Sequence, residues 1–482
     1  MLFNSYIFIL LFLPLALAGY FLINRKSFAG GKVWLVAMSL WFYAYYNPLY
    51  LMILIASVVF NYGAGKMISG LAQHRKLALA LGIAVNLAAL FYFKYYDFFV
   101  ENINYLFKTG FTLRHLILPL AISFFTFKQI AYLVDSYRGE VPVGRFLDYT
   151  LFVVFFPQLI MGPILLPGEL IPQFLDEAKK KINYENLAKG MMAFAFGLAK
   201  KVLLADTFAV AVDWGYAHII WLNTTDALLL MLFFTLQIYF DFSGYCDMAT
   251  GLGLMFNIDI AQNFNSPYRA LSVADFWQRW HITLTRFFRK YLYIPLGGNR
   301  KGKARTYLHY FLVFLVSGLW HGANYTFIVW GAAHGLFFCL AKLCQKQIDR
   351  IPALINWLFT FLFVNFTWVL FRAESLGQSG QLFGKMADLK FGTVSKGLSE
   401  AFYLPETVFV NKIFTPVIVS DFQVFLWPLT LFAVYAAVFM RNTNERIAVF
   451  APKALGICTT VILSVWGILS LSGVETYIYM GF

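Results

Sequence analysis

One histidine in this sequence combines a reactive side chain with open surroundings. His321 ends the apolar run 307–321 and lies in Gly318-Leu-Trp-His-Gly322, where small neighbours leave room for a substrate to approach. A neutral imidazole in a dry site suits proton abstraction from a hydroxyl group, because its ordinary pKa lies near physiological pH. We therefore predict that His321 acts as a general base.

Two more histidines, one before and one after it in the sequence, bear on this prediction. His281 ends the aromatic and basic segment Asp275-Phe-Trp-Gln-Arg-Trp-His281, and His334 follows His321 by thirteen residues. On one continuous helix His334 and His321 would point about 140° apart, so only a break at Gly322 brings them together. The histidines are dispersed and lack paired carboxylates, so no metal site is expected.

Charged residues inside apolar runs form a second group of candidates, since each is costly in a bilayer. Gln237 and Asp241 are four residues apart and share one helix face, where they serve either substrate binding or helix–helix contact. Lys128 and the pair Lys200-Lys201 are expected to be structural. Lys200 is also a candidate to neutralise a phosphate of a donor molecule.

The segment from Asp275 to Arg300 is too charged to cross a membrane. Its aromatic and basic residues are typical of an interfacial or re-entrant helix, which ends here at a Pro/Gly turn. Binding of lipid headgroups accounts for Arg286, Arg289 and Lys290, but it accounts less well for Arg279-Trp-His281.

These candidates belong to a chain that uses lipid as its solvent. Of its 482 residues, 60% are hydrophobic and only 13% are charged, whereas about a quarter of a soluble domain is charged. This balance excludes a soluble enzyme, a disordered chain and a nucleic-acid binder. The net charge of +14 is typical of Lys and Arg retained in cytoplasmic loops.

The apolar runs predict an all-α polytopic membrane protein with about 11–13 transmembrane or re-entrant helices. They lie at 3–23, 33–47, 48–66, 77–99, 115–137, 146–165, 187–212, 226–256, 307–321, 323–345, 353–371, 423–441 and 455–473. No linker divides the chain, so we expect one membrane domain over 1–482 with its core motifs at 226–345.

The basic loops all fall on the cytoplasmic side if one of the three apolar runs between 146 and 275 does not cross the membrane. The densest basic stretch, 286–305, is then cytoplasmic. The segment 373–422 lacks a basic excess and is expected to be extracytoplasmic.

Several motifs, taken together, resemble the membrane-bound O-acyltransferase family, in particular bacterial members that O-acetylate alginate and other exopolysaccharides. They are Tyr239-Phe-Asp-Phe-Ser-Gly-Tyr245, Asn263-Phe-Asn-Ser-Pro-Tyr268, Asp275-Phe-Trp-Gln-Arg-Trp-His281, Tyr291-Leu-Tyr-Ile-Pro-Leu-Gly-Gly-Asn-Arg300 and Gly318-Leu-Trp-His-Gly322. Weaker similarity extends through Ile122–Phe127, Phe155–Gln158 and Gly162-Pro163 to Tyr477-Ile-Tyr479.

The resemblance implies helices arranged as a funnel or ring around a central tunnel, in the bacterial inner membrane. It assigns the essential histidine to His321 and a supporting histidine to His281. It implies a cytoplasmic acyl thioester as donor, most simply acetyl-CoA, and an extracytoplasmic polysaccharide such as alginate as acceptor. A periplasmic hydrolase-like acetyltransferase is the expected partner.

In the expected mechanism the basic stretch meets the donor's phosphates, and indole, imidazole or amide groups stabilise the developing oxyanion. The candidate substrate-binding residues are Trp277, Arg279, Trp280, Asn299, Trp320, Asn324, Asp241, Tyr245, Arg286, Arg289 and Lys290.

Two alternatives remain open at this point. A transporter of acylated or lipid-linked substrate would use the same polar residues without chemistry. D-Alanyl transfer from a carrier protein to teichoic acid would use the basic stretch as a docking surface. A metal-dependent glycosyltransferase is disfavoured, since the sequence contains no Asp-x-Asp.

Overall fold

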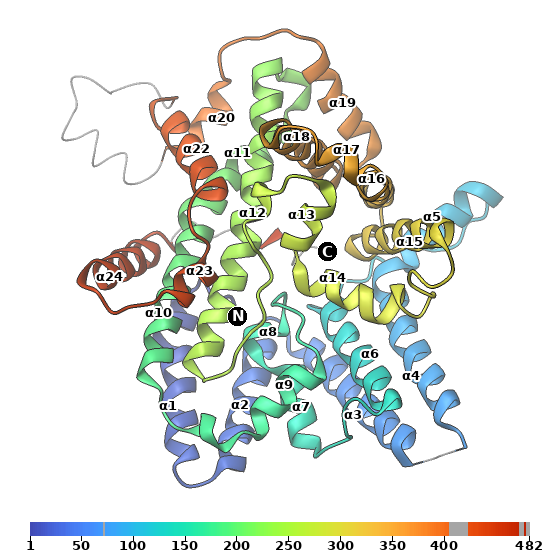
Figure 1. The fold of residues 1–482 in the computed structure, drawn as a ribbon, viewed down its shortest axis with the longest axis vertical. Helices are drawn as coiled ribbons and strands as arrows, with labels where there is room; N and C mark the ends of the chain where they lie inside the picture. The colour runs from blue at the N-terminus through green and yellow to red at the C-terminus, as the bar shows by residue number, and fades with distance from the viewer. Residues whose placement is uncertain (71–72, 404–422, 472–476, 479–482) are drawn as a thin grey trace.

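The computed structural model describes residues 1–70, 73–403, 423–471 and 477–478, and every regular element in these residues is a helix. Figure 1 shows α10 and α12 next to each other, with α13 and α14 beside α12 and the hairpin of α15 and α16 beyond them. The predicted all-α fold of a polytopic membrane protein is confirmed.

The helices follow the apolar runs of the sequence closely. The first part contains η1 (Phe8–Phe12), α1 (Leu13–Asn24), α2 (Phe28–Ala44), α3 (Pro48–Gly70), α4 (Arg75–Leu90), η2 (Phe91–Tyr95), α5 (Tyr96–Phe107), α6 (Ile122–Arg138), α7 (Phe146–Val154) and α8 (Phe156–Leu159). The middle contains α9 (Pro167–Leu175), η3 (Glu177–Lys180), α10 (Tyr184–Ala199), η4 (Lys200–Ala205), α11 (Asp206–Ala217), η5 (Ile219–Trp221), α12 (Thr224–Met255), η6 (Pro267–Arg269), α13 (Val273–Arg279), α14 (Ile282–Phe288) and η7 (Arg289–Tyr293). The last part contains α15 (Lys303–His321), α16 (Tyr325–Leu343), α17 (Gln345–Ile348), α18 (Ala353–Arg372), α19 (Leu376–Ala387), α20 (Lys396–Glu400), α22 (Gln423–Val438), α23 (Thr443–Ala448) and α24 (Ala454–Leu469).

Within the described residues, five helices are long and apolar enough to cross a membrane: 48–70, 75–107, 224–255, 325–343 and 353–372. Most residues of α12 are buried inside the protein, whereas most residues of the other four are only half-buried or exposed. An apolar helix surface of this kind requires lipid around it. Further apolar helices are shorter, and lie at 8–24, 425–438 and 454–469.

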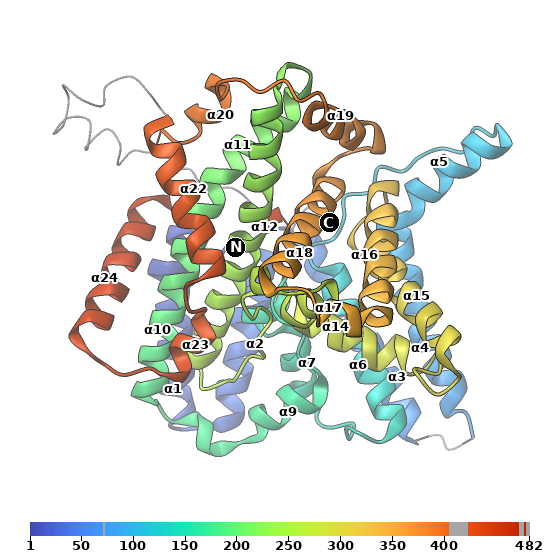
Figure 2. The same cartoon turned by 45° about the horizontal axis from the view of Figure 1, so that its top comes forward.

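The apolar run at 146–165 does not form one spanning helix. It gives α7 and α8, which are separated at Phe155 and have nine and four residues, whereas a span needs about 20. The prediction that all the basic loops share one side requires that one such run does not cross the membrane, and it stays a prediction. Figure 2 shows α19 and α20 at the end of the molecule opposite α9 and the α1–α2 connection. The end of the predicted external segment, 404–422, lies outside the described residues, as does Tyr479.

Close glycine contacts join α10 to the central helix α12. A Cβ atom on Gly197 would lie 2.5 Å from the carbonyl oxygen of Gly244, and one on Gly190 would lie 2.6 Å from that of Gly251. The two glycines of each helix are seven residues apart and share a face. The backbones therefore approach as closely as small residues allow in membrane helices.

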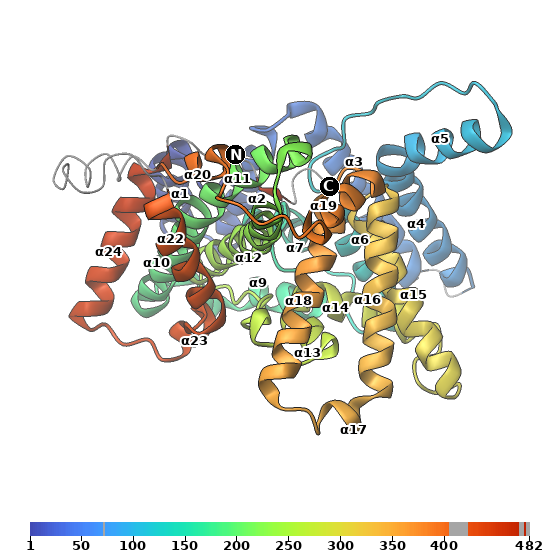
Figure 3. The same cartoon turned by 90° about the horizontal axis from the view of Figure 1, so that it is seen from above.

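The segment 275–300, predicted as an interfacial or re-entrant helix, is divided in the structure. It forms α13 and α14, separated at Trp280 and His281, and then the π-helix η7. The backbone of His281 is left-handed, with φ of 45°. Trp280 and His281 are both buried, so this segment enters the interior. Figure 3 shows α5, by contrast, at the edge of the molecule.

Candidate active site

The hairpin of α15 and α16 places His321 beside the second of these helices. The two helices are separated at Gly322–Asn324 and run back along each other (Figure 3). A Cβ on Gly331 would lie 2.6 Å from the carbonyl oxygen of Phe314, and one on Gly318 would overlap the carbonyl oxygen of Phe327. Glycine at both positions permits this approach, and the break at Gly322 brings His321 and His334 to the same region.

The ring of His321 lies in an aromatic enclosure. Its centroid is 4.8 Å from the ring of Trp320, 5.2 Å from Trp330 and 5.2 Å from Phe371. His321 is 2% exposed. The indole N–H groups of Trp320, Trp330 and Trp368 are buried, and within the described part of the chain they have no hydrogen-bond partner. Buried donors of this kind are rare and call for a functional explanation.

His281 lies on the other side of Trp320, with ring centroids 6.4 Å apart. Its Nδ1 is 3.1 Å from Oδ1 of Asn263, which also accepts the backbone N–H of Thr283 at 3.2 Å. A backbone N–H can only donate, so this atom of Asn263 is an acceptor. Nδ1 of His281 must therefore carry the proton and donate it, which leaves Nε2 as the acceptor nitrogen of the neutral ring.

His334 is held at both ring nitrogens. Nδ1 accepts the indole N–H of Trp277 at 3.1 Å, and Nε2 lies 3.0 Å from the hydroxyl oxygen of Thr367. The Thr367 hydroxyl itself donates to the carbonyl of Val364 at 2.9 Å. Nε2 therefore donates to Thr367, and His334 is a neutral ring fixed in the core. The ring of Trp330 contacts both His334 and His321, with centroids 4.8 Å and 5.2 Å away.

The structure divides the predicted basic residues into two groups. Arg286 forms an ion pair with Glu169, and Lys290 lies 3.0 Å from Asp135 and 2.5 Å from Glu140. Arg289 is exposed, as are Arg300, Lys301, Lys303 and Arg305 in the following turn and the start of α15. The charges of this second, exposed group are accessible from outside the protein.

Asp241 and Tyr245 lie on a different side of α12 from the histidines. Nζ of Lys201 is 2.7 Å from carboxylate oxygens of both Asp241 and Asp206, and Asp241 accepts the backbone N–H of Ile478 at 2.9 Å. Tyr245 stacks on Phe3 at a centroid distance of 4.7 Å. The next residue after Asp241, Phe242, contacts the ring of His281 at 4.8 Å. Lys200, the candidate phosphate partner, forms its own pair with Asp247 at 2.6 Å.

The remaining predicted residues are spread around the histidines. Trp280 is buried against Phe264 and Trp368, at 4.9 Å from each ring centroid. Arg279 pairs with Asp275 at 2.7 Å. Asn324 caps α16 and donates to the carbonyl of Glu374 at 2.8 Å.

Asn299 is exposed in the turn before α15. Sequence reasoning did not single out Asn263 or Thr367. Asn263 is the first residue of the motif Asn263-Phe-Asn-Ser-Pro-Tyr268, whereas no motif or polar pattern in the sequence includes Thr367.

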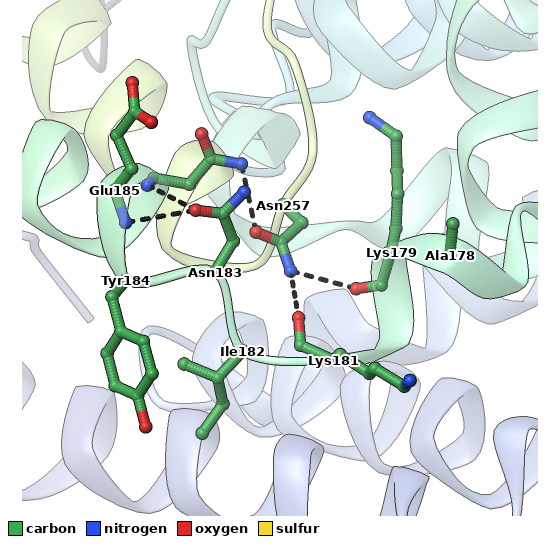
Figure 4. Close-up of a pocket in the computed structure, with 9 residues that line it drawn as sticks. Ala178, Lys179, Lys181, Ile182, Asn183, Tyr184, Glu185 and Asn257 are labelled. Carbon is green, nitrogen blue, oxygen red and sulfur yellow. Dashed lines mark hydrogen bonds between the residues drawn. The ribbon is translucent and has the colours of Figure 1, made fainter.

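A separate pocket of about 580 Å³ lies between η3, the start of α10 and Asn257. Figure 4 shows its amide groups directed at one another and at the backbone. Asn257 donates to the carbonyls of Lys179 at 3.0 Å and Lys181 at 2.7 Å, and Asn186 donates to Asn257 at 3.1 Å. These amides join two backbone segments, and none of the predicted site residues lines the pocket.

No group of three or more His, Cys, Asp or Glu residues in the described ranges has the arrangement of a metal site. His334 bonds to Trp277 and Thr367, and Nδ1 of His281 bonds to Asn263, whereas zinc is held by Cys, His or carboxylate ligands.

The family model for the membrane-bound O-acyltransferases matches residues 143–380, which include His281, His321 and His334. A peptidoglycan O-acetyltransferase of Helicobacter pylori is 45% identical over 409 residues, covering 78% of this chain and 78% of the relative. This chain belongs to the membrane-bound O-acyltransferase family. As an O-acyltransferase of the membrane, it has the enzymatic class that its motifs predict.

Two further relatives show the range within this family. A probable alginate O-acetylase AlgI of Pseudomonas putida is 41% identical over 397 residues, covering 80% of each chain. A teichoic acid D-alanyltransferase of Bacillus subtilis is 25% identical over 284 residues, which cover 54% of this chain and 70% of the relative. Similarity is therefore higher and more extensive to this O-acetylase than to this D-alanyltransferase.

Proposed function

We propose that this O-acyltransferase moves an acetyl group from acetyl-CoA in the cytoplasm to hydroxyl groups of an extracytoplasmic polysaccharide. The observation that carries the proposal is the position of His321, at the end of α15 and enclosed by aromatic rings with unpartnered indole N–H groups. The names of the closely similar O-acetylating relatives favour acetyl as the acyl group.

In the proposed reaction, His321 takes the proton of the acceptor hydroxyl as its oxygen attacks the thioester carbonyl. A carbon–oxygen bond forms, the carbon–sulfur bond breaks, and the proton passes from His321 to the departing sulfur. The carbonyl oxygen carries negative charge in between. The indole N–H groups of Trp320 and Trp330 flank His321 and are suited to stabilise that charge.

The donor is proposed to enter from the side of the basic loops. Exposed Arg289, Arg300 and Lys301 are suited to its phosphates, because Arg286 and Lys290 already pair with carboxylates. His321 is 2% exposed, so neighbouring aromatic side chains must move before the thioester reaches it. Their closure afterwards would exclude water and suppress hydrolysis.

The bacterial inner membrane is the proposed location, with the polysaccharide on the side of α19 and α20. A periplasmic hydrolase-like acetyltransferase is the proposed partner, which either receives the acetyl group or acts beside this chain. Alginate and peptidoglycan are the acceptors to test, since relatives are named for them.

Reconstituted liposomes test the proposal directly. Acetyl-labelled acetyl-CoA is added on one side of the membrane, and alginate or peptidoglycan fragments are present on the other. We expect label in the fragments with the wild type, and a loss of about 10²–10⁴-fold with His321→Ala. His309→Ala is the matched control, since His309 lies on the same helix and its hydrogen bond within the described residues is to the turn at Gly298.

The competing functions give different results in the same assay. Unchanged acetylated substrate crossing the bilayer would support a transporter. Use of a carrier-bound D-alanyl thioester but not acetyl-CoA would support D-alanyl transfer. Wild-type rates with His321→Ala would refute the role of His321, and label that reaches only an added hydrolase-like partner would show a relay.

A further inference from the structure

A lysine distant in sequence reaches the end of the helix that carries His321. Lys94 lies in the π-helix η2, between α4 and α5. Its Nζ is 2.6 Å from the carbonyl oxygen of Trp320, 3.2 Å from that of His321 and 3.5 Å from the hydroxyl of Ser123. The amino group thus joins three segments of the chain at the proposed general base.

The carbonyl groups that receive these bonds belong to the last turn of α15. The last four carbonyls of a helix have no partner within it and need donors from elsewhere. Tyr95, the residue after Lys94, donates its hydroxyl to the carbonyl of Leu319 at 2.9 Å. Two adjacent residues of η2 therefore hold three successive carbonyls, those of Leu319, Trp320 and His321.

The π-helical turn is consistent with this arrangement. Single π turns inside longer helices are uncommon and occur frequently at functional sites, because they widen the helix and redirect adjacent side chains. The Lys94 amino group also lies 5.7 Å from the ring centroid of Trp320. It therefore contacts both the backbone and the ring of the residue directly before His321.

We propose that Lys94 is a positioning residue for catalysis, which fixes the end of α15 and thereby the imidazole of His321. This inference rests on the function proposed above. Lysine has three donor hydrogens and no acceptor, and three acceptors lie within 3.5 Å of Nζ. Lys94 thus acts through His321, and direct contact with substrate is not part of the proposal.

The test compares kcat and KM for acetyl-CoA in Lys94→Met and Lys94→Arg. Methionine retains the length of the side chain but removes every donor, so the last turn of α15 loses its amino-group contacts. We expect kcat to fall about 10–100-fold with KM within twofold of wild type, since a small misplacement of a reacting group has effects of this size. Arginine retains donors and should recover most of the loss.

Lys385→Met is the matched control. Lys385 also donates to a carbonyl at the end of a short helix, that of Ile220 at 2.6 Å, but it extends from α19. Its loss should leave kcat unchanged. If Lys94→Met does not accumulate as folded protein, Tyr95→Phe tests the hold of η2 on the same last turn of α15 by removing the neighbouring bond to Leu319, and its kcat should fall several-fold at constant KM.

The outcomes separate this inference from the function on which it rests. A kcat within twofold of wild type in Lys94→Met, or in Tyr95→Phe when Lys94→Met does not fold, overturns the positioning role. So does a lower unfolding midpoint with normal kcat per folded molecule. Absence of transfer by the wild type, or full transfer by His321→Ala, would instead refute the proposed function.

Discussion

Two sides of the central helix α12 carry polar groups into the membrane in contrasting ways. One side holds Asp241 and Asp247, each within 2.7 Å of a lysine of η4. The other side meets the histidine region, where Phe242 contacts His281 and Cys246 accepts from Asn263. The first side is charged and closed by ion pairs, and the second is uncharged and aromatic.

The difference separates groups that stabilise the fold from groups that can react. A charge buried in a membrane protein is tolerated when an opposite charge and hydrogen bonds surround it, and an ion so held has little freedom to bind substrate. Neutral imidazole and indole rings cost less to bury and can gain a proton or donate a hydrogen bond during a reaction. We infer that the charged side holds α12 to η4 and that chemistry belongs to the aromatic side.

The largest stability effect is expected from Lys201→Met. This change leaves Asp241 and Asp206 without the lysine they share, and removal of one partner of a buried pair costs about 3–5 kcal/mol. The unfolding midpoint in detergent should fall markedly, while the transfer rate per folded molecule stays near wild type.

Lys189→Met provides the comparison for this variant. Lys189 pairs with an exposed carboxylate, Glu185, four residues earlier, and a surface pair contributes about 1 kcal/mol or less. A large loss of rate in folded Lys201→Met would contradict the division between the two sides of α12.

Most of the helices follow from the sequence, because their runs of apolar residues are long enough to be unambiguous. The helix break after His321 is also visible in it, as Gly322 followed by Asn324 and a new apolar run. The division of 275–300 into two helices was not predictable. Nothing in the sequence requires a left-handed backbone at His281, and tertiary contacts of its ring and of Trp280 decide it.

The candidate site was predicted in part. His321, His281, Trp280 and Trp320 do lie together, because the motifs that contain them occur at the ends of short or broken helices. Lys94 was missed, although a lysine at 94 inside the apolar run 77–99 is a signal of the kind applied to Lys128 and Lys200. Its partners at the end of α15, Trp320 and His321, are more than 220 residues away, and only the fold shows that they meet.

Asn263→Ala is expected to have an intermediate effect, measured as the rate per folded molecule. It removes the acceptor that fixes the tautomer and orientation of His281. Loss of a buried hydrogen bond of this kind costs about 1–3 kcal/mol, which predicts a fall in kcat of roughly 10–100-fold. Single-turnover transfer from acetyl-CoA measures it.

Thr283→Val is the control for Asn263→Ala. It removes the Thr283 hydroxyl, which donates to the same amide oxygen at 2.9 Å and accepts the backbone N–H of Ile164 at 3.0 Å, but it leaves the bond between Asn263 and His281 in place. Its rate should remain within threefold of wild type. An equal loss in both variants would show that the loop around Asn263, and not His281, is what matters.

The smallest effect on the transfer rate is expected from loss of a contact to His334. This variant compares His334 with His321, since both lie on the aromatic side of α12. Thr367→Val removes the hydroxyl that accepts from His334 Nε2 while keeping the shape of the side chain. The free energy of unfolding should fall by about 1 kcal/mol, with little change in rate, because both nitrogens of His334 are occupied in holding the core. Thr360 lies on the same helix, and its hydroxyl donates to the carbonyl of Asn356 within that helix at 2.8 Å, so Thr360→Val should change stability less. A loss of rate in folded Thr367→Val that Thr360→Val does not share would place His334 in the chemistry beside His321.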